Sequence, residues 1–222
     1  NYDFTVNPQW LTERGARFGG EYRYLTRWGQ GSLYGDYLPH DKKTKTKRYY
    51  WHGQHLSQGT LGEGVWQANI NARRMSDNGF IDDFSVQDWD GGARTMPSEY
   101  SLRYKQDGLS LRLRQKSYQT LQTKNNQVDA PYDFKPQFEM RYHKRWGNWL
   151  LNTQLESTRF AHDDIQNKAQ GWRHLIYPSI AYEWRTPGAF IVPKLGLHIT
   201  QYALSRVPLP ANANGITYDK SA

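Results

Sequence analysis

The sequence contains no cysteine, which excludes a disulfide framework and a thiolate metal site and leaves the redox compartment undetermined. It also lacks any apolar run near the roughly 18 residues that a transmembrane helix needs, and no apolar signal-peptide core follows Asn1. Hydrophobic residues make up only 37% of the chain, and the mean hydropathy is -0.92. A helical membrane protein and a protein with a large conventional core are therefore not expected.

Aromatic residues, by contrast, are abundant. They form 15% of the chain, with 9 Trp, 16 Tyr and 8 Phe, which is too many for a disordered polar chain. Apolar surface therefore exists, but it is dispersed along the sequence. The net charge of +8 is compatible with nucleic acid, an anionic membrane surface or an anionic glycolipid as partner. The positions of the charges have to decide among these partners.

Apolar and polar residues alternate with a period of two along most of the chain, which is typical of β-strands. From Tyr2 to Trp10, apolar residues take every second position. The pattern recurs and predicts about eleven strands. The apolar members of the later repeats are Phe18, Tyr22 and Tyr24; Leu33 and Tyr37; Tyr49 and Trp51; Trp66, Ala68, Ile70 and Ala72; Tyr100, Leu102 and Tyr104; Leu109, Leu111 and Leu113; Phe134, Pro136, Phe138, Met140 and Tyr142; Trp149, Leu151 and Leu155; Ile176, Pro178, Ile180, Tyr182 and Trp184; and Pro193, Leu195, Leu197 and Ile199.

The connections between these segments alternate in length. Short turns are predicted at residues 28–31, 58–64, 106–108, 145–148 and 185–188. Longer polar loops are predicted at residues 39–47, 75–96, 122–132, 161–171 and from 203 onward, and the connection at 12–16 is short although its parity matches the loops. Short turns at one end and long loops at the other are typical of an outer-membrane β-barrel. We expect the long loops to be extracellular.

These features predict an all-β fold, the antiparallel wall of a transmembrane β-barrel, with residues 1–222 forming part of one such domain. Tilted strands cross the hydrocarbon layer in about 9–11 residues, and aromatic residues near the strand ends would form interfacial girdles. A soluble β-sandwich also shows alternation and is the alternative fold. Its strands are usually shorter, about 5–6 residues, and it seldom carries so many aromatic residues at both strand ends.

The alternation assigns residues to two faces of the predicted wall. Charged side chains on the lipid face would cost several kcal/mol near the midplane, whereas a wet lumen tolerates them. The basic excess would then favour solutes with phosphate or carboxylate groups, or it would form a polar network that braces the wall. The candidate lipid-facing residues are Phe4, Trp10, Tyr22, Tyr24, Trp66, Ile70, Leu111, Phe138 and Ile180, and the candidate lumen-facing residues are Arg17, Glu21, Arg23, Arg27, Arg73, Arg103, Arg112, Arg114, Lys135 and Arg141.

No catalytic constellation is evident, and we expect no enzyme activity, metal or cofactor. Acidic and histidine residues do cluster in predicted loops, where they are ordinarily solvated or cap turns. A basic run in the loop at 39–47 resembles a nucleic-acid patch, but on a cell surface it would meet anionic glycolipid or nothing in particular. The acidic and histidine clusters are His162, Asp163 and Asp164; Asp82 and Asp83; and Asp88 and Asp90, and the basic run is Lys42, Lys43, Lys45, Lys47 and Arg48.

Several segments resemble the barrel of one family, the LPS-assembly protein LptD. The segments are EYRYL at 21–25, GDYLPHD at 35–41, RYYWHGQH at 48–55, and RMSD at 74–77 followed by Phe80, Asp83 and Phe84. Pro136, Gln137 and Pro178 also fall where the strands of that family carry similar residues. The match follows the order of the whole chain.

The resemblance implies transport without bond chemistry in the outer membrane of a Gram-negative bacterium. It implies a barrel of about 26 strands that, with the plug lipoprotein LptE and a periplasmic jellyroll, delivers lipopolysaccharide into the outer leaflet. It also implies contacts with periplasmic LPS-bridge proteins and, during folding, with the barrel-assembly machinery. In that family, lipid is thought to leave by a seam between the first and last strands.

The chain is expected to be a mature or excised segment from the N-terminal part of such a barrel. It lacks a jellyroll, the closing strands and the cysteines of the family, so neither the seam nor the lipid-entry site is assigned here. About eleven strands would leave two unpaired edges, which are untenable in lipid. We therefore expect the other strands to have been removed, unresolved or replaced by partner strands. A passive anion-favouring channel and a barrel enzyme are the alternative functions.

Overall fold

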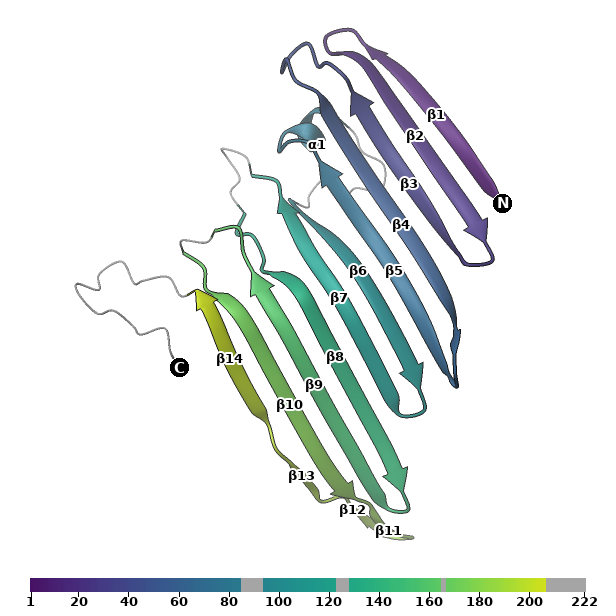
Figure 1. The fold of residues 1–222 in the computed structure, drawn as a ribbon, viewed down its shortest axis with the longest axis vertical. Helices are drawn as coiled ribbons and strands as arrows, with labels where there is room; N and C mark the ends of the chain where they lie inside the picture. The colour runs from purple at the N-terminus through teal and green to yellow at the C-terminus, as the bar shows by residue number, and fades with distance from the viewer. Residues whose placement is uncertain (85–93, 123–127, 165–166, 207–222) are drawn as a thin grey trace, which may run out of the picture.

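The computed structural model describes residues 1–84, 94–122, 128–164 and 167–206. Most of them lie in one open antiparallel sheet, drawn in Figure 1. The long strands are β1 (Tyr2–Leu11), β2 (Gly15–Thr26), β3 (Gly29–Leu38), β4 (Arg48–Leu61), β5 (Gly64–Met75), β6 (Thr95–Gln106), β7 (Leu109–Thr120), β8 (Asp133–Trp146), β9 (Trp149–Ala161) and β10 (Gln170–Tyr182), and the shorter ones are β11 (Trp184–Thr186), β12 (Ala189–Ile191), β13 (Lys194–Gly196) and β14 (Ile199–Arg206).

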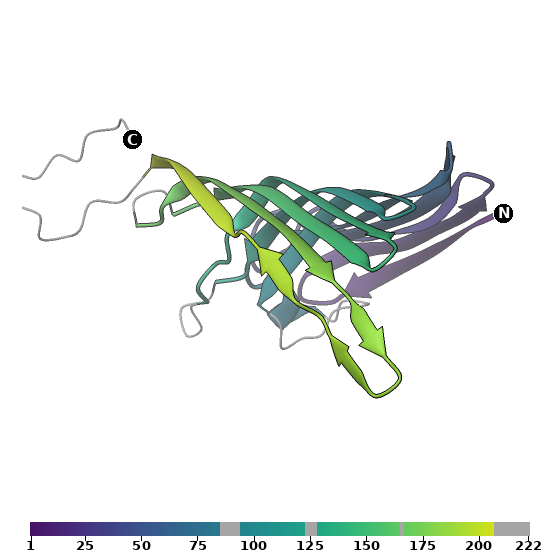
Figure 2. The same ribbon diagram turned by 90° about the horizontal axis from the view of Figure 1, so that it is seen from below.

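Strands β1 to β10 pair in sequence order, and β13 and β14 both pair with β10. β11 and β12 form a separate hairpin that extends beyond β10. Because β13 and β14 follow one another along the same edge, the 12-stranded sheet has eleven strand positions, as the alternation predicted. The sheet is curved (Figure 2), and β1 and β13/β14 each pair on one side only within the described residues. The open sheet fits a fragment of a barrel.

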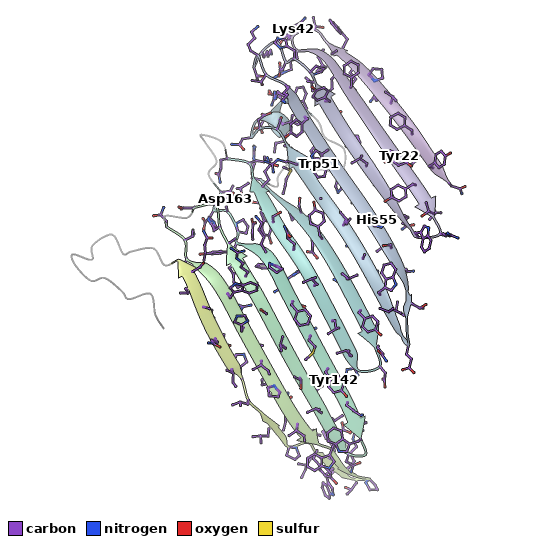
Figure 3. The ribbon with its side chains drawn as sticks, viewed as in Figure 1. Tyr22, Lys42, Trp51, His55, Tyr142 and Asp163 are labelled. Atoms are coloured by element: carbon purple, nitrogen blue, oxygen red, sulfur yellow. The ribbon has the colours of Figure 1, made fainter. Side chains whose placement is uncertain are left out.

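The connections confirm the predicted asymmetry. Two-residue turns join β2 to β3, β4 to β5, β6 to β7, β8 to β9 and β11 to β12, all at what we term the short-turn end. The longer connections lie at the opposite, long-loop end, where Figure 3 shows Lys42 and Asp163. The turn Asp107-Gly108 illustrates the local cause, because Gly108 has a φ of 70° and Asp-Gly is a favoured hairpin pair.

The pairing register shows which residues share a face. Cross-strand partners lie on the same face of an antiparallel sheet, and the chain of partners Phe4, Tyr22 and Leu33 continues across the sheet. All nine candidate lipid-facing residues lie on this side, which we term the apolar face. The opposite side, which we term the charged face, carries Arg17, Glu21, Arg23, Arg73, Arg103, Arg112, Arg114 and Arg141.

Two candidate lumen residues do not follow this pattern. Arg27 lies in the turn between β2 and β3, with its guanidinium 4.5 Å from the centre of the Trp28 ring. Lys135 lies in a β-bulge between Phe134 and Gln137 and forms a 2.5 Å ion pair with Asp133. The bulge interrupts the alternation, because an extra residue shifts the parity of the strand. The faces predicted for Phe134 and Lys135 from the alternation are therefore wrong, and Phe134 lies on the charged face opposite Lys116.

The only helix among the described residues, α1 (Phe80–Asp83), lies in the connection between β5 and β6. It packs on the long-loop end of the charged face. No helix in the described ranges has the length and apolar composition to cross a membrane. Among the described residues, seven of the nine buried hydrophobic side chains form one cluster that includes Phe80 of α1: Leu38, Tyr50, Met75, Phe80, Phe84, Met96 and Leu121.

Candidate functional site

Carboxylates and arginines interdigitate in the middle of the charged face. Arg112 of β7 donates a 2.8 Å hydrogen bond to Glu99 of β6 and lies 3.9 Å from Glu139 of β8. Arg114 lies 3.8 Å from each of the same two carboxylates. These side chains are 17–24% exposed. The two arginines therefore tie three neighbouring strands together and are largely neutralised.

A second chain of contacts continues from this cluster to β10. Arg114 donates to Gln137, whose amide donates a 2.9 Å hydrogen bond to Thr158. The Thr158 hydroxyl donates to Glu156 at 2.9 Å, and Arg173 pairs with Glu156 at 2.5 Å. Since Thr158 and Gln137 are buried, these hydrogen bonds satisfy groups that would be costly to leave unpaired.

The first three strands carry two further arginine–carboxylate pairs. Arg17 donates two hydrogen bonds to Asp36, at 2.7 and 3.0 Å, in a buried site. Arg23 donates two to Asp3, at 3.0 and 3.1 Å, in an exposed one. Such bidentate pairs hold the planar guanidinium in one orientation. The Arg17 pair therefore braces the sheet, whereas the exposed Arg23 pair contributes little to stability.

Arg103 and Arg141 differ from the paired arginines of the charged face. Both are exposed, and in the part of the chain that the structure describes neither forms an ion pair. They lie on the charged face of β6 and β8, with β7 between them. The candidate basic residues thus include arginines that are paired with carboxylates and exposed arginines that form no ion pair among the described residues.

Arg48 organises the long-loop end of the charged face. Its side chain is 2% exposed and donates hydrogen bonds to Asp77 at 2.7 and 2.9 Å and to Asp83 at 2.6 Å. It also donates to Asp41 at 3.1 Å. Arg14 contacts two of these carboxylates, Asp41 at 2.7 Å and Asp83 at 2.5 Å. We term these five residues the Arg48 network.

The network keeps its carboxylates ionised. Burial would raise the pKa of Asp41, but the backbone amide of Lys43 and the guanidinium groups of Arg48 and Arg14 outweigh it and lower the pKa to about 2. Burial also acts to raise the pKa of Asp77, but hydrogen bonds from Arg48, Ser76 and the Gly79 amide, together with the charge of Arg48, outweigh it and lower the pKa. Both groups are therefore charged at neutral pH, and residues 77–83 are held against the sheet.

Aromatic packing reinforces the same contact. The guanidinium groups of Arg14, Arg17 and Arg48 lie 5.1, 5.3 and 5.0 Å from the centre of the Phe84 ring. The rings of Phe80 and Phe84 are 4.9 Å apart. Cation–π contacts of this kind strengthen where the cation is desolvated. The helix α1 is therefore fixed by charge and by apolar burial together.

The sequence pattern does not indicate this network. The predicted basic loop run includes Arg48, and Asp83 is predicted to be solvated or to cap a turn, whereas Arg48 is the first residue of β4 and binds Asp83. Asp82 is also paired, with Arg94 at 2.8 Å. One available signal was the spacing of Phe80 and Phe84, which places both rings on one side of a helical turn.

The acidic and histidine clusters have structural roles where the structure describes them. His162 is buried, accepts a hydrogen bond from the amide of Asp164 at 2.9 Å and contacts the carbonyl of Ala130 at 2.9 Å. Both ring nitrogens are thus used in fixing a loop. Within the described ranges, no group of three or more metal-ligating side chains occurs. Asp88 and Asp90 lie outside the described residues.

The apolar face exposes large hydrophobic side chains rather than burying them. Phe4, Trp10, Leu33, Leu102 and Leu113 are each 49–72% exposed. Figure 3 shows Tyr22, Trp51, His55 and Tyr142, which belong to this face, spread across the sheet. Leu25 and Val65, near the short-turn end, are exposed hydrophobics on the charged face. Despite these exceptions, the two faces differ clearly in polarity.

Comparison with known proteins gives the family. A family model described as LPS transport system D matches residues 46–222. The LPS-assembly protein LptD of Neisseria gonorrhoeae is 33% identical over 211 residues, covering 92% of this chain and 25% of that protein. The LPS-assembly proteins LptD of Ralstonia nicotianae and Bordetella pertussis are 31% and 32% identical, over 93% and 91% of this chain. The chain spans about a quarter of the length of these curated relatives. The chain belongs to the LptD family.

Proposed function

We propose that this chain forms part of the wall of an outer-membrane β-barrel that delivers lipopolysaccharide to the outer leaflet of a Gram-negative bacterium. The observation that carries the proposal is the division of one antiparallel sheet into an apolar face and a charged face, in a chain of the LptD family. The apolar face contacts lipid, the charged face lines a wet lumen, and the long loops are extracellular.

The open edges support a larger assembly. β1 and β13/β14 carry backbone groups that pair on one side only within the described sheet, and such groups are costly in a bilayer. Further strands of the complete protein would pair with them. We extend the proposal to the partners of that protein: lipopolysaccharide, the plug lipoprotein LptE, the periplasmic LPS-bridge proteins and the barrel-assembly machinery. Family membership supports these partners.

Within the lumen, Arg103 and Arg141 are the cations that contact the passing molecule. Their guanidinium groups are exposed and are not neutralised by a carboxylate in the described residues, so they can donate paired hydrogen bonds to phosphate or to acidic sugars. The arginines beside them, Arg112 and Arg114, are bound to Glu99 and Glu139 and hold the wall.

Site-specific photocrosslinking in the complete protein tests this assignment. A photoreactive residue at position 103 or 141 should form lipopolysaccharide adducts that depend on active transport. Position 102 or 140, which lies on the apolar face of the same strands, should form adducts with membrane lipid regardless of transport. Transport-dependent adducts at 102 and 140, with none at 103 and 141, would reverse the assignment of the faces.

A passive anion channel is less consistent with these observations. The pairing of Arg112, Arg114, Arg17 and Arg173 with carboxylates reduces the basic excess on which anion selectivity was predicted, and the relatives are named for assembly rather than diffusion. A steady, wide, anion-selective conductance of the complete barrel without any partner would support the channel.

A further inference from the structure

Two tryptophan–arginine pairs lie at the long-loop end of the apolar face. Trp51 of β4 is the direct cross-strand partner of Arg74 of β5, and Trp172 of β10 is the partner of Arg159 of β9. Directly opposite residues bring their side chains within about 5 Å of one another at Cβ. Trp51 is labelled in Figure 3 in the half of the sheet nearer the long loops.

These arginines are unusual for their face. Within strands β1 to β10, the carboxylates lie on the charged face except Asp133, which is paired with Lys135. Arg74 and Arg159 are exposed, and among the described residues neither forms an ion pair. An arginine facing lipid costs about 2–4 kcal/mol at the bilayer midplane but about 0–1 near the interface. Both residues lie within the last residues of their strands, at the depth where the cost is small.

A third cation–aromatic contact lies at the same end. The Lys42 ammonium is 5.4 Å from the centre of the Trp10 ring, which belongs to the apolar face. Tryptophan favours the interface because its ring is apolar and its N–H is a donor. Beside it, a guanidinium can bind two oxygens of one phosphate group. The combination matches a lipid with an apolar tail and a phosphate-bearing headgroup.

We propose that Trp51/Arg74 and Trp172/Arg159 are two binding sites for the phosphate-bearing headgroups of lipids that surround the barrel at its long-loop end. The pairs are separated by four strand spacings, roughly 19 Å, so each holds its own lipid. This inference rests on the proposed function, in which the apolar face contacts lipid. The two sites lie on the apolar face, whereas Arg103 and Arg141 lie on the charged face.

The test uses the complete purified barrel in detergent micelles, titrated with lipid A that carries its phosphates and followed by native mass spectrometry. The variant Arg74→Gln/Arg159→Gln should retain about tenfold less phosphorylated lipid A than the wild type. Two controls match it: Arg112→Gln removes a cation from the charged face, and Lys144→Gln removes one from the apolar face near the short-turn end. Both controls should retain wild-type binding.

Dephosphorylated lipid A gives the second arm, and it should bind the wild type and the double variant equally weakly. Retention unchanged in the double variant, or reduced equally with dephosphorylated lipid A, would overturn the proposal. The proposal would also be overturned if Lys144→Gln or Arg112→Gln lowered the binding of phosphorylated lipid A as much as the double variant does. Because binding is measured on the purified barrel, a barrel that binds at these sites but delivers no lipopolysaccharide in cells would contradict the proposed function alone.

Discussion

Replacing Arg48 by methionine should release α1 from the sheet. Removing one partner of a buried ion pair costs about 3–5 kcal/mol, because the remaining charges are left uncompensated. Asp77 and Asp83 are 40% and 32% exposed, so water partly replaces the lost guanidinium. Arg14 still neutralises Asp41. We therefore expect the low end of the range, about 3 kcal/mol.

Hydrogen exchange in the complete protein measures this local opening. The amide of Phe84 donates a 3.0 Å hydrogen bond to the carbonyl of Phe80, so its exchange reports whether α1 is formed. A loss of about 3 kcal/mol corresponds to exchange roughly 150-fold faster. Lys47→Met is the matched control, because Lys47 is an exposed cation next to Arg48. Exchange within twofold of the wild type in Arg48→Met, or equal acceleration in Lys47→Met, would refute the reasoning.

Two further predictions concern pH and the faces of the sheet. Because the folded-state pKa of Asp41 is about 2 and that of Asp77 is also lowered, their stabilisation is complete above the unfolded value of about 3.9 and is lost as pH falls toward 2. The protection factor of the Phe84 amide, which is the intrinsic exchange rate at each pH divided by the observed rate, should therefore fall across that window, and a pH-independent protection factor would contradict the network. Leu111→Arg should impair membrane assembly more than Arg112→Gln. An arginine in lipid costs about 2–4 kcal/mol, whereas a partly exposed ion pair contributes about 1 kcal/mol. Assembly is measured as the amount of heat-modifiable folded barrel, and equal amounts for the two variants would contradict the assignment of faces.

The strands and their faces could be predicted because the controlling property is local. A strand directs successive side chains to opposite sides, so Tyr22 and Arg23 are assigned to different faces by adjacency alone. The hairpin at Asp107-Gly108 is equally local. The prediction was wrong at Phe134 and Lys135, where a bulge adds one residue to β8. Nothing in the alternation distinguishes that extra residue from its neighbours, and a shift of one position reverses the face of every residue before it.

Alternation and turn chemistry act over a few residues, so the amino-acid sequence is enough to predict amphipathic antiparallel strands with short turns at one end and longer loops at the other. Which charges are neutralised depends instead on the tertiary fold. Arg48 meets Asp77 and Asp83 across 29 and 35 residues of sequence, and Arg112 meets Glu99 and Glu139 through the register of three strands. An ion pair forms only when its charged atoms lie within about 4 Å of each other, so partners that are distant in the chain become recognisable only when the sheet brings them together.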